Sequence, residues 1–132
     1  MKQTILEIQY DIMKQYKNVI DFRVCNQEIA YCYIPERIVY MCSNDFINPT
    51  AESLFDLLHE IGHILTNTYN MKRCEEEYYA TQWAIKEMKK LEFQISHKRK
   101  KEFQNYIWKW RETGIKLKAK NMPSKEQLIL EW

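Results

Sequence analysis

The chain has 132 residues, of which 45% are hydrophobic and 14% aromatic, and its formal net charge is only +2. This is the size of one ordinary domain with enough apolar surface for a core, so we expect residues 1–132 to form a single domain. No apolar run approaches the roughly 18 residues that span a membrane, and the polar N-terminal residues exclude a secretory apolar region, so a cytoplasmic protein is expected.

The cysteines and the charge distribution narrow the class of protein further. The four cysteines contain no CxxC pair, a pattern that favours reduced thiols over a zinc ribbon or a disulfide framework. The positive charge is concentrated in residues 96–120, where nine Lys or Arg face two Asp or Glu.

The first half of the chain predicts one helix and two strands. Apolar residues recur at helical spacing in residues 4–17, which predicts an amphipathic helix that covers the core. Residues 18–28 show no clean period and lead to no prediction. Residues 29–34 and 38–42 are rich in β-branched and aromatic residues, so two short strands joined by a tight turn at Pro35-Glu36-Arg37 are expected.

The next helix carries the motif with the clearest chemistry. Asn, Asp and Pro predict a loop at residues 43–50, after which a helix is expected to continue to about Asn67. This helix contains His59-Glu60-Ile61-Gly62-His63, in which two imidazoles four residues apart lie on one face and can bind one metal ion. Glycine inside a helix costs about 1 kcal/mol relative to alanine, so Gly62 indicates the close approach of a neighbouring element.

A second helix is expected to complete the metal site. After a polar connection, Glu75-Glu76-Glu77 begins a helix with acids at its positive end, and Ala80 and Ala84 share a face with Glu77. Small residues on that face allow this helix to pack closely on the motif helix.

Zinc chemistry assigns a role to each of these polar residues. A catalytic zinc site has three protein ligands and one open position, and His59 and His63 supply two of them. Helix phase ranks Glu77 first as the third ligand, ahead of Glu76 and then Glu75. Glu60 lies about 100° round the helix from His59, where it can act as the general base without binding the metal.

These two segments resemble a known family. The HExxH helix followed by Glu77-Tyr78-Tyr79-Ala80-Thr81-Gln82-Trp83-Ala84 is similar to the ImmA/IrrE-type metallopeptidases, whose second helix has an E-x-x-A-x-x-F-A pattern. Trp83 stands where that family usually has Phe. The resemblance covers residues 29–92, the expected core.

The resemblance implies a fold and an activity. The fold is a small α+β zincin-like domain, in which the HExxH helix packs on a second helix beside a short hairpin or small sheet. The activity is that of an intracellular zinc peptidase, common in phages and mobile elements, that often cleaves or inactivates a transcriptional repressor.

The expected reaction is hydrolysis of a peptide bond in a protein substrate. Zinc would activate a bound water and polarise the carbonyl group, while Glu60 would accept the proton of the water and return it to the leaving amine. A second oxyanion donor is also expected. The sequence does not choose among its four candidates, which are Tyr69, Tyr78, Tyr79 and His97.

The C-terminal part predicts a basic helical extension at residues 96–132. A stripe at helical spacing predicts a helix at 98–113 that ends near Gly114 and packs on the core. The stripe consists of Phe103, Tyr106, Ile107 and Trp110. Ser124 and Gln127 predict a capping box for a final short helix.

The lysines of this extension, interleaved with Trp108 and Trp110, raise an alternative function. The chain would then be a non-catalytic, zinc-containing regulatory protein that binds nucleic acid or an acidic partner. A solvated basic face is the favoured interpretation of this region, and the sequence indicates nothing about the oligomeric state.

Overall fold

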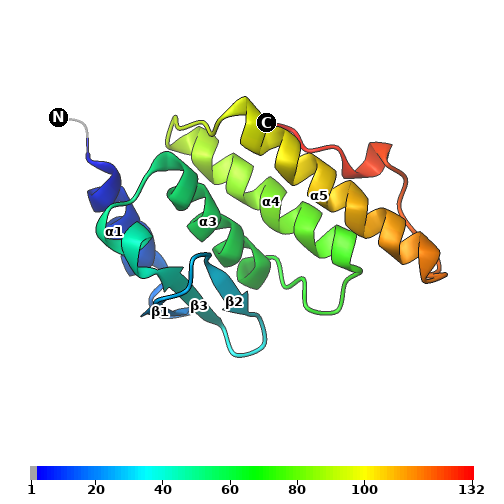
Figure 1. Ribbon diagram of the computed structural model, residues 1–132. Helices are drawn as coiled ribbons and strands as arrows, with labels where there is room; N and C mark the ends of the chain where they lie inside the picture. The colour runs from blue at the N-terminus through cyan, green and yellow to red at the C-terminus, as the bar shows by residue number, and fades with distance from the viewer. Residues whose placement is uncertain (1–2) are drawn as a thin grey trace.

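Residues 3–132, the part of the chain that the computed structural model describes, form an α+β structure of five α-helices and one three-stranded sheet (Figure 1). Helix α3 (Ala51–Leu65) lies at the centre, with the sheet and α1 on one side and α4 on the other. The predicted fold class, a small α+β structure with terminal helices, is confirmed. Within residues 3–132 no helix combines the length and apolarity needed to cross a bilayer.

Helix α1 (Ile5–Tyr16) covers the core as predicted. The Thr4 side chain accepts a hydrogen bond from the Glu7 amide, and the Glu7 side chain accepts one from the Thr4 amide, which completes a capping box. Ile8 and Ile12 bury the inner face of the helix.

The sheet has the strand order β1-β3-β2, with β1 at Asp21–Cys25, β2 at Tyr31–Tyr33 and β3 at Ile38–Cys42. Strands β2 and β3 pair antiparallel, as expected of the predicted hairpin. Strand β1 pairs parallel with β3 and lies in a segment that led to no prediction. Cys32 pairs with the buried Val39, so its side chain lies on the face of the sheet that α3 covers.

Helix α2 (Ser43–Ile47) occupies the segment predicted to be a loop, so that prediction was wrong. A tertiary contact holds this short helix, because the Phe46 carbonyl accepts a hydrogen bond from the buried Gln9 side chain of α1 at 3.1 Å. Local composition does not reveal a partner 37 residues away.

Helices α3 and α4 (Arg73–Lys90) pack closely around Gly62. A Cβ atom at Gly62 would lie 2.7 Å from the Ala80 carbonyl oxygen, closer than side-chain atoms approach a carbonyl. The predicted close approach at Gly62 is confirmed, and Ala80 and Ala84 are completely buried beside it. Helix α4 begins two residues before the predicted Glu75.

Helix α5 (His97–Lys116) passes through Gly114, so the predicted helix end there was wrong. A Cβ atom at Gly114 would lie 2.6 Å from Met122 Cε, which indicates that this glycine makes room for packing. Ile107 is buried as predicted, whereas Tyr106 from the same stripe is 38% exposed.

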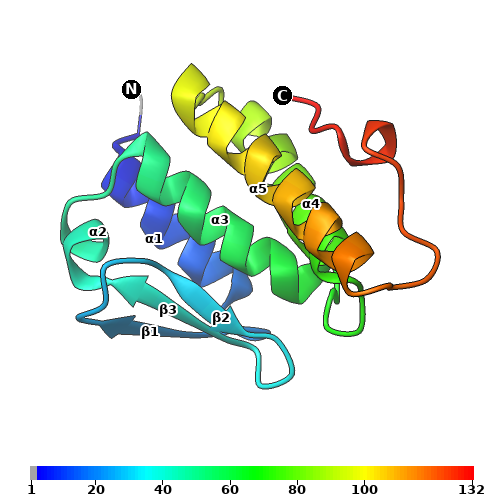
Figure 2. The same ribbon diagram turned by 45° about the vertical axis from the view of Figure 1, so that its right-hand side comes forward.

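The final segment folds back over α4 and α5 (Figure 2). Ser124 and Gln127 form the predicted capping box, but they cap a single 3-10 turn, η1 (Glu126–Leu128). Two glutamine side chains bind the segment to the helices. Gln82 of α4 donates to the Glu131 carbonyl and accepts from the Glu131 amide. Gln104 of α5 donates to the Leu128 carbonyl and accepts from the Leu130 amide.

Candidate metal centre

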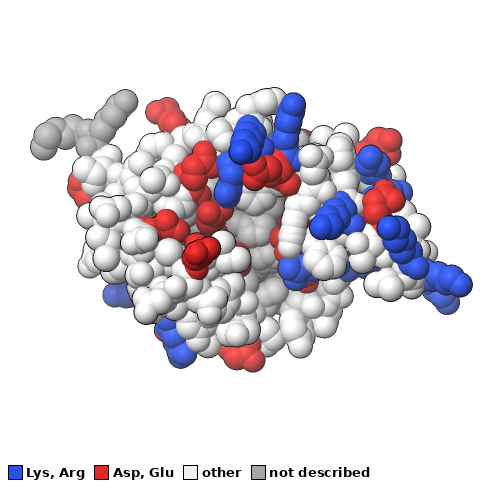
Figure 3. Space-filling model, in the orientation of Figure 1, with Lys and Arg blue, Asp and Glu red and all other residues white. Residues whose placement is uncertain are grey.

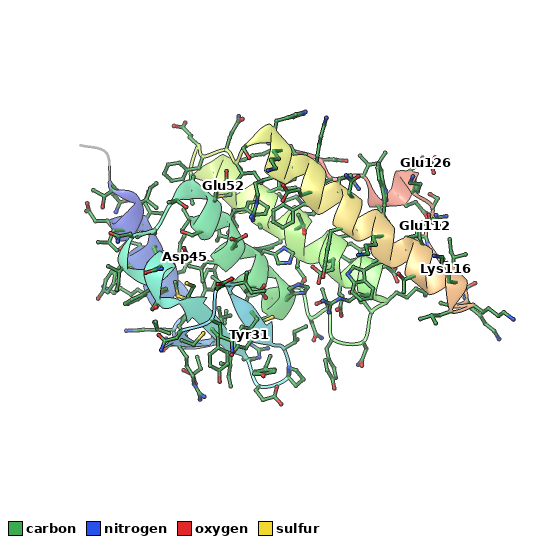
Figure 4. All side chains as sticks on the ribbon, in the orientation of Figure 1. Tyr31, Asp45, Glu52, Glu112, Lys116 and Glu126 are labelled. Atoms are coloured by element: carbon green, nitrogen blue, oxygen red, sulfur yellow. The ribbon has the colours of Figure 1, made fainter. Side chains whose placement is uncertain are left out.

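A cleft of about 500 Å³ lies between α3 and α5, lined also by residues 29 and 30 before β2. Figure 3 shows it as a hollow in the middle of this face, with acidic and basic side chains on its rim. Two contacts fasten the start of α5 to α3. Glu52, labelled in Figure 4, accepts a hydrogen bond from the Ser96 amide at 2.9 Å, and Arg99 bonds Asp56 at 2.6 Å.

Three electron-pair donors meet inside this region. His59 Nε2 lies 3.2 Å from His63 Nε2 and 3.0 Å from Glu77 Oε2, and His63 Nε2 lies 3.5 Å from the same Glu77 oxygen. All three residues are buried. Helix α3 supplies both histidines from successive turns, and α4 brings Glu77 to them through the close approach at Gly62.

Two buried threonine hydroxyls orient the imidazole rings. Thr81 Oγ1 donates to the Glu77 carbonyl at 2.6 Å and lies 3.1 Å from His59 Nδ1. Thr68 Oγ1 donates to the His63 carbonyl at 3.3 Å and lies 3.1 Å from His63 Nδ1. Each hydroxyl proton is already used, so each Nδ1 must be the donor to its threonine. With Nδ1 as the donor to each threonine, both Nε2 atoms point towards Glu77 Oε2, where a cation could bind them.

Arg73 holds the other side of the Glu77 carboxylate. Its guanidinium lies 3.1 Å from Glu77 Oε1 and 2.7 Å from Glu76 Oε1, so Oε2 of Glu77 is free to face the histidines. Glu76, the second candidate ligand, is therefore paired with Arg73. The third candidate, Glu75, lies near Lys72 at 3.8 Å. Helix phase had ranked Glu77 first, and the structure places this carboxylate beside the imidazoles.

The electrostatics of the cluster favour positive charge. Burial opposes protonation of His59, but the Glu77 hydrogen bond and the carboxylates of Glu60 and Asp56 outweigh it and raise the pKa of this imidazole. Burial likewise works to raise the pKa of Glu77, but the two histidines hold it well below its usual range. A cluster of this kind stabilises a cation placed among its donors.

The donor set fits a zinc ion. Four ligands at the usual zinc bond lengths of about 2.0–2.1 Å form a tetrahedron whose edges measure roughly 3.3 Å. The three separations of 3.0, 3.2 and 3.5 Å are close to that value. Two imidazoles and one carboxylate also match the ligand types of catalytic zinc sites. In the residues 3–132 that the structure describes, His59, His63 and Glu77 are the one group of His, Cys, Asp or Glu close enough to hold a metal.

Glu60 lines the same cleft as His59 and Glu77. The Cys32 thiol of β2 lies near this carboxylate, and burial together with the charge of Glu60 raises the pKa of Cys32 well above its usual range. The thiol therefore stays protonated, and it is a neutral neighbour of Glu60.

The four predicted oxyanion donors lie outside the cleft. Tyr69, Tyr79 and His97 are exposed, and Tyr78 is half-buried against the core. Tyr106 of α5 lines the cleft instead, near Arg73. Its place in an apolar stripe indicates a core role, so the sequence does not identify it as a donor.

The threonine contact to His59 leads to a measurable prediction. The variant Thr81→Val keeps the shape of the side chain but removes the acceptor for His59 Nδ1–H. We expect the zinc affinity to fall about 10–100-fold, as found when partners of metal-bound histidines are lost. Competition with a chelating dye measures this change. Thr113→Val is the matched control, because that hydroxyl bonds the Lys109 carbonyl on α5. Equal affinities for the two variants would contradict the orienting role.

Within the basic extension, Phe103 and Tyr106 of α5 line the cleft. Lys116, labelled in Figure 4, lies away from the cluster at the far end of the same helix. Trp108 donates to the Lys125 carbonyl, and Trp110 stacks with the Arg73 guanidinium at 5.1 Å. Both indole rings therefore make contacts within the chain. These contacts do not support the alternative in which the two tryptophans stack on nucleic-acid bases.

Comparisons with known proteins add one match. A nucleotide-binding leucine-rich repeat (NLR)-like protein of Hyaloscypha variabilis (strain UAMH 11265 / GT02V1 / F) is 34% identical over 82 residues, which is 61% of this chain. No family model matches the chain, and no solved structure matches it. The chain spans only 8% of the length of the NLR-like protein, so this match does not assign the chain to a family.

Proposed function

We propose that this chain is a zinc-dependent metallopeptidase of the ImmA/IrrE type, with a zincin-like fold, that hydrolyses a peptide bond in a protein substrate. The observation that carries the proposal is the meeting of His59 Nε2, His63 Nε2 and Glu77 Oε2 within 3.5 Å beside a cleft that also contains Glu60. A transcriptional repressor is the proposed substrate class. The four cysteines, all of them free, fit a reducing compartment such as the cytoplasm.

Each residue of the cluster has a proposed task. His59, His63 and Glu77 would hold the ion, which would supply a Lewis acid that lowers the pKa of water towards about 7 and polarises a carbonyl. The Glu60 carboxylate accepts a proton from the attacking water and delivers it to the leaving amine. Arg73 and the two threonines fix the ligands, so the site is organised before a substrate enters.

Tyr106 is the proposed hydroxyl donor to the substrate carbonyl oxygen. Arg73 has no acceptor atom, so it cannot take the hydroxyl proton of the neighbouring Tyr106. Thr81, the other residue with a side-chain hydroxyl that lines the cleft, already donates to the Glu77 carbonyl.

The variant Tyr106→Phe tests this role. We expect kcat to fall about 100-fold, as for loss of other oxyanion donors, with KM and zinc content unchanged. Binding of a peptide phosphinate, which mimics the tetrahedral transition state, should weaken by a similar factor. Tyr79→Phe is the matched control because Tyr79 is exposed outside the cleft. A Tyr106→Phe enzyme with wild-type kcat would exclude the residue from this role.

The activity itself is tested with a mixture of peptides of known sequence. Protein loaded with zinc is incubated with the mixture, and mass spectrometry identifies new peptide ends. We expect cleavage that a chelator abolishes and added zinc restores. Cleavage that persists after removal of all metal would contradict the proposal, and so would the absence of cleavage of both the peptides and repressor proteins.

A further inference from the structure

Helix α1 lies on the opposite side of α3 from α4 (Figures 1 and 2), and a second large hollow runs along it. It is a groove of about 1360 Å³ between α1, the α1–β1 connection and α2. Its walls carry apolar side chains that are 39–66% exposed. These are Leu6, Tyr10, Val19, Phe46 and Ile47. Exposed apolar side chains gathered in one groove are typical of an interaction surface.

A hydrogen bond joins the two helices that border the groove. Gln9 of α1 is only 2% exposed and donates through Nε2 to the Phe46 carbonyl of α2. This bond ties the two walls of the groove to each other within the chain.

Charge is divided along α1. Glu7 and Asp11 line the N-terminal half of the groove, while Lys14 and Lys17 line the C-terminal half. All four are exposed, and within residues 3–132 none of them forms an ion pair. A second helix with acids in its N-terminal half and lysines in its C-terminal half would complement this pattern. If it ran antiparallel to α1, its acids would face the lysines of α1 and its lysines would face the acids of α1.

The α1 helix of a second copy has this charge pattern. We propose that the chain forms a two-fold dimer in which the two α1 helices lie side by side and antiparallel, each in the groove of the other copy. The two-fold axis makes every contact occur twice, so Glu7 and Asp11 of each copy face Lys14 and Lys17 of the other. Tyr10, near the middle of the helix, lies close to the axis and covers apolar surface on both copies.

Two charge variants of the full chain test the dimer. In the acidic variant Lys14→Glu is combined with Lys17→Glu, and in the basic variant Glu7→Lys is combined with Asp11→Lys. Sedimentation equilibrium over micromolar concentrations should show a wild-type dimer. Each variant alone should have a dissociation constant at least about tenfold higher, because like charges then meet along the interface. An equimolar mixture of the two should form a one-to-one heterodimer.

Two further measurements separate this groove from other surfaces. Lys98→Glu combined with Lys101→Glu makes the same charge change at exposed positions of α5, and it should leave the dimer unchanged. Tyr10→Ser, which alters a largely exposed side chain and no core contact, should weaken the dimer. A wild-type chain that remains monomeric overturns the proposal. A dimer whose dissociation constant is unchanged by all of the α1 substitutions also overturns the proposal. The same holds if the mixture of the two charge variants does not associate.

Discussion

Replacing Glu77 with alanine is expected to lower the zinc affinity of the chain by more than about 100-fold. Loss of an orienting partner alone costs about 10–100-fold, and Glu77→Ala removes both a charged ligand and the partner of Arg73. The histidines would retain only two of the three donors that a catalytic zinc site uses. Metal competition with a chelating dye measures the loss.

The neighbouring glutamates provide the controls for Glu77. Glu75→Ala removes an acid two residues before Glu77, where the side chain lies near Lys72, and should leave the affinity unchanged. Thermal unfolding gives an independent readout, because zinc that binds only the folded chain should raise the Tm of Glu75→Ala and of the wild type far more than that of Glu77→Ala. Zinc bound by Glu77→Ala with wild-type affinity would remove Glu77 from the ligand set.

The variant Glu60→Gln is expected to keep zinc and lose hydrolysis. Glutamine preserves the shape of the side chain and its place beside the neutral Cys32 thiol, so the cleft should remain intact. It cannot accept the proton of the attacking water. General acid–base catalysis contributes about 10²–10⁴ in rate, and kcat should fall by a factor in that range.

A second carboxylate in the cleft separates the role of Glu60 from a general effect of charge. Glu102 lines the same cleft from α5, and Glu102→Gln changes the cleft charge by the same amount. We expect this control variant to retain most of the activity and all of the zinc. If Glu60→Gln hydrolyses peptides at the wild-type rate, another residue must serve as the base.

The part of the site that local periodicity encodes could be predicted from the sequence. The spacing of His59 and His63 places both imidazoles on one helix face, and the phase of Glu77 relative to Ala80 and Ala84 directs it at them. Arg73 and Thr81 lie four residues before and after Glu77, so the same phase argument places them beside it. They were missed because the argument was applied to carboxylates alone.

Other parts of the molecule depend on tertiary contacts that no local pattern shows. Tyr106 reaches the cleft only because α5 folds back over α4, and Cys32 meets Glu60 only through the register of β2 with β3. Thr68 orients His63 from a connection whose path depends on the packing of the two helices it joins. Strand β1 forms beside β3, although polar and apolar residues alternate over only four of its positions and three of its five residues are exposed.

Metal analysis of the purified wild-type chain tests the central claim most directly. The protein is dialysed against a chelator, reloaded with an excess of zinc, freed of unbound ions and measured for zinc per chain, beside the variant His59→Ala. The convergence of His59, His63 and Glu77 predicts one zinc per wild-type chain and a large loss in the variant. A folded wild-type chain that retains no zinc, or a His59→Ala chain that retains as much as the wild type, would contradict the account.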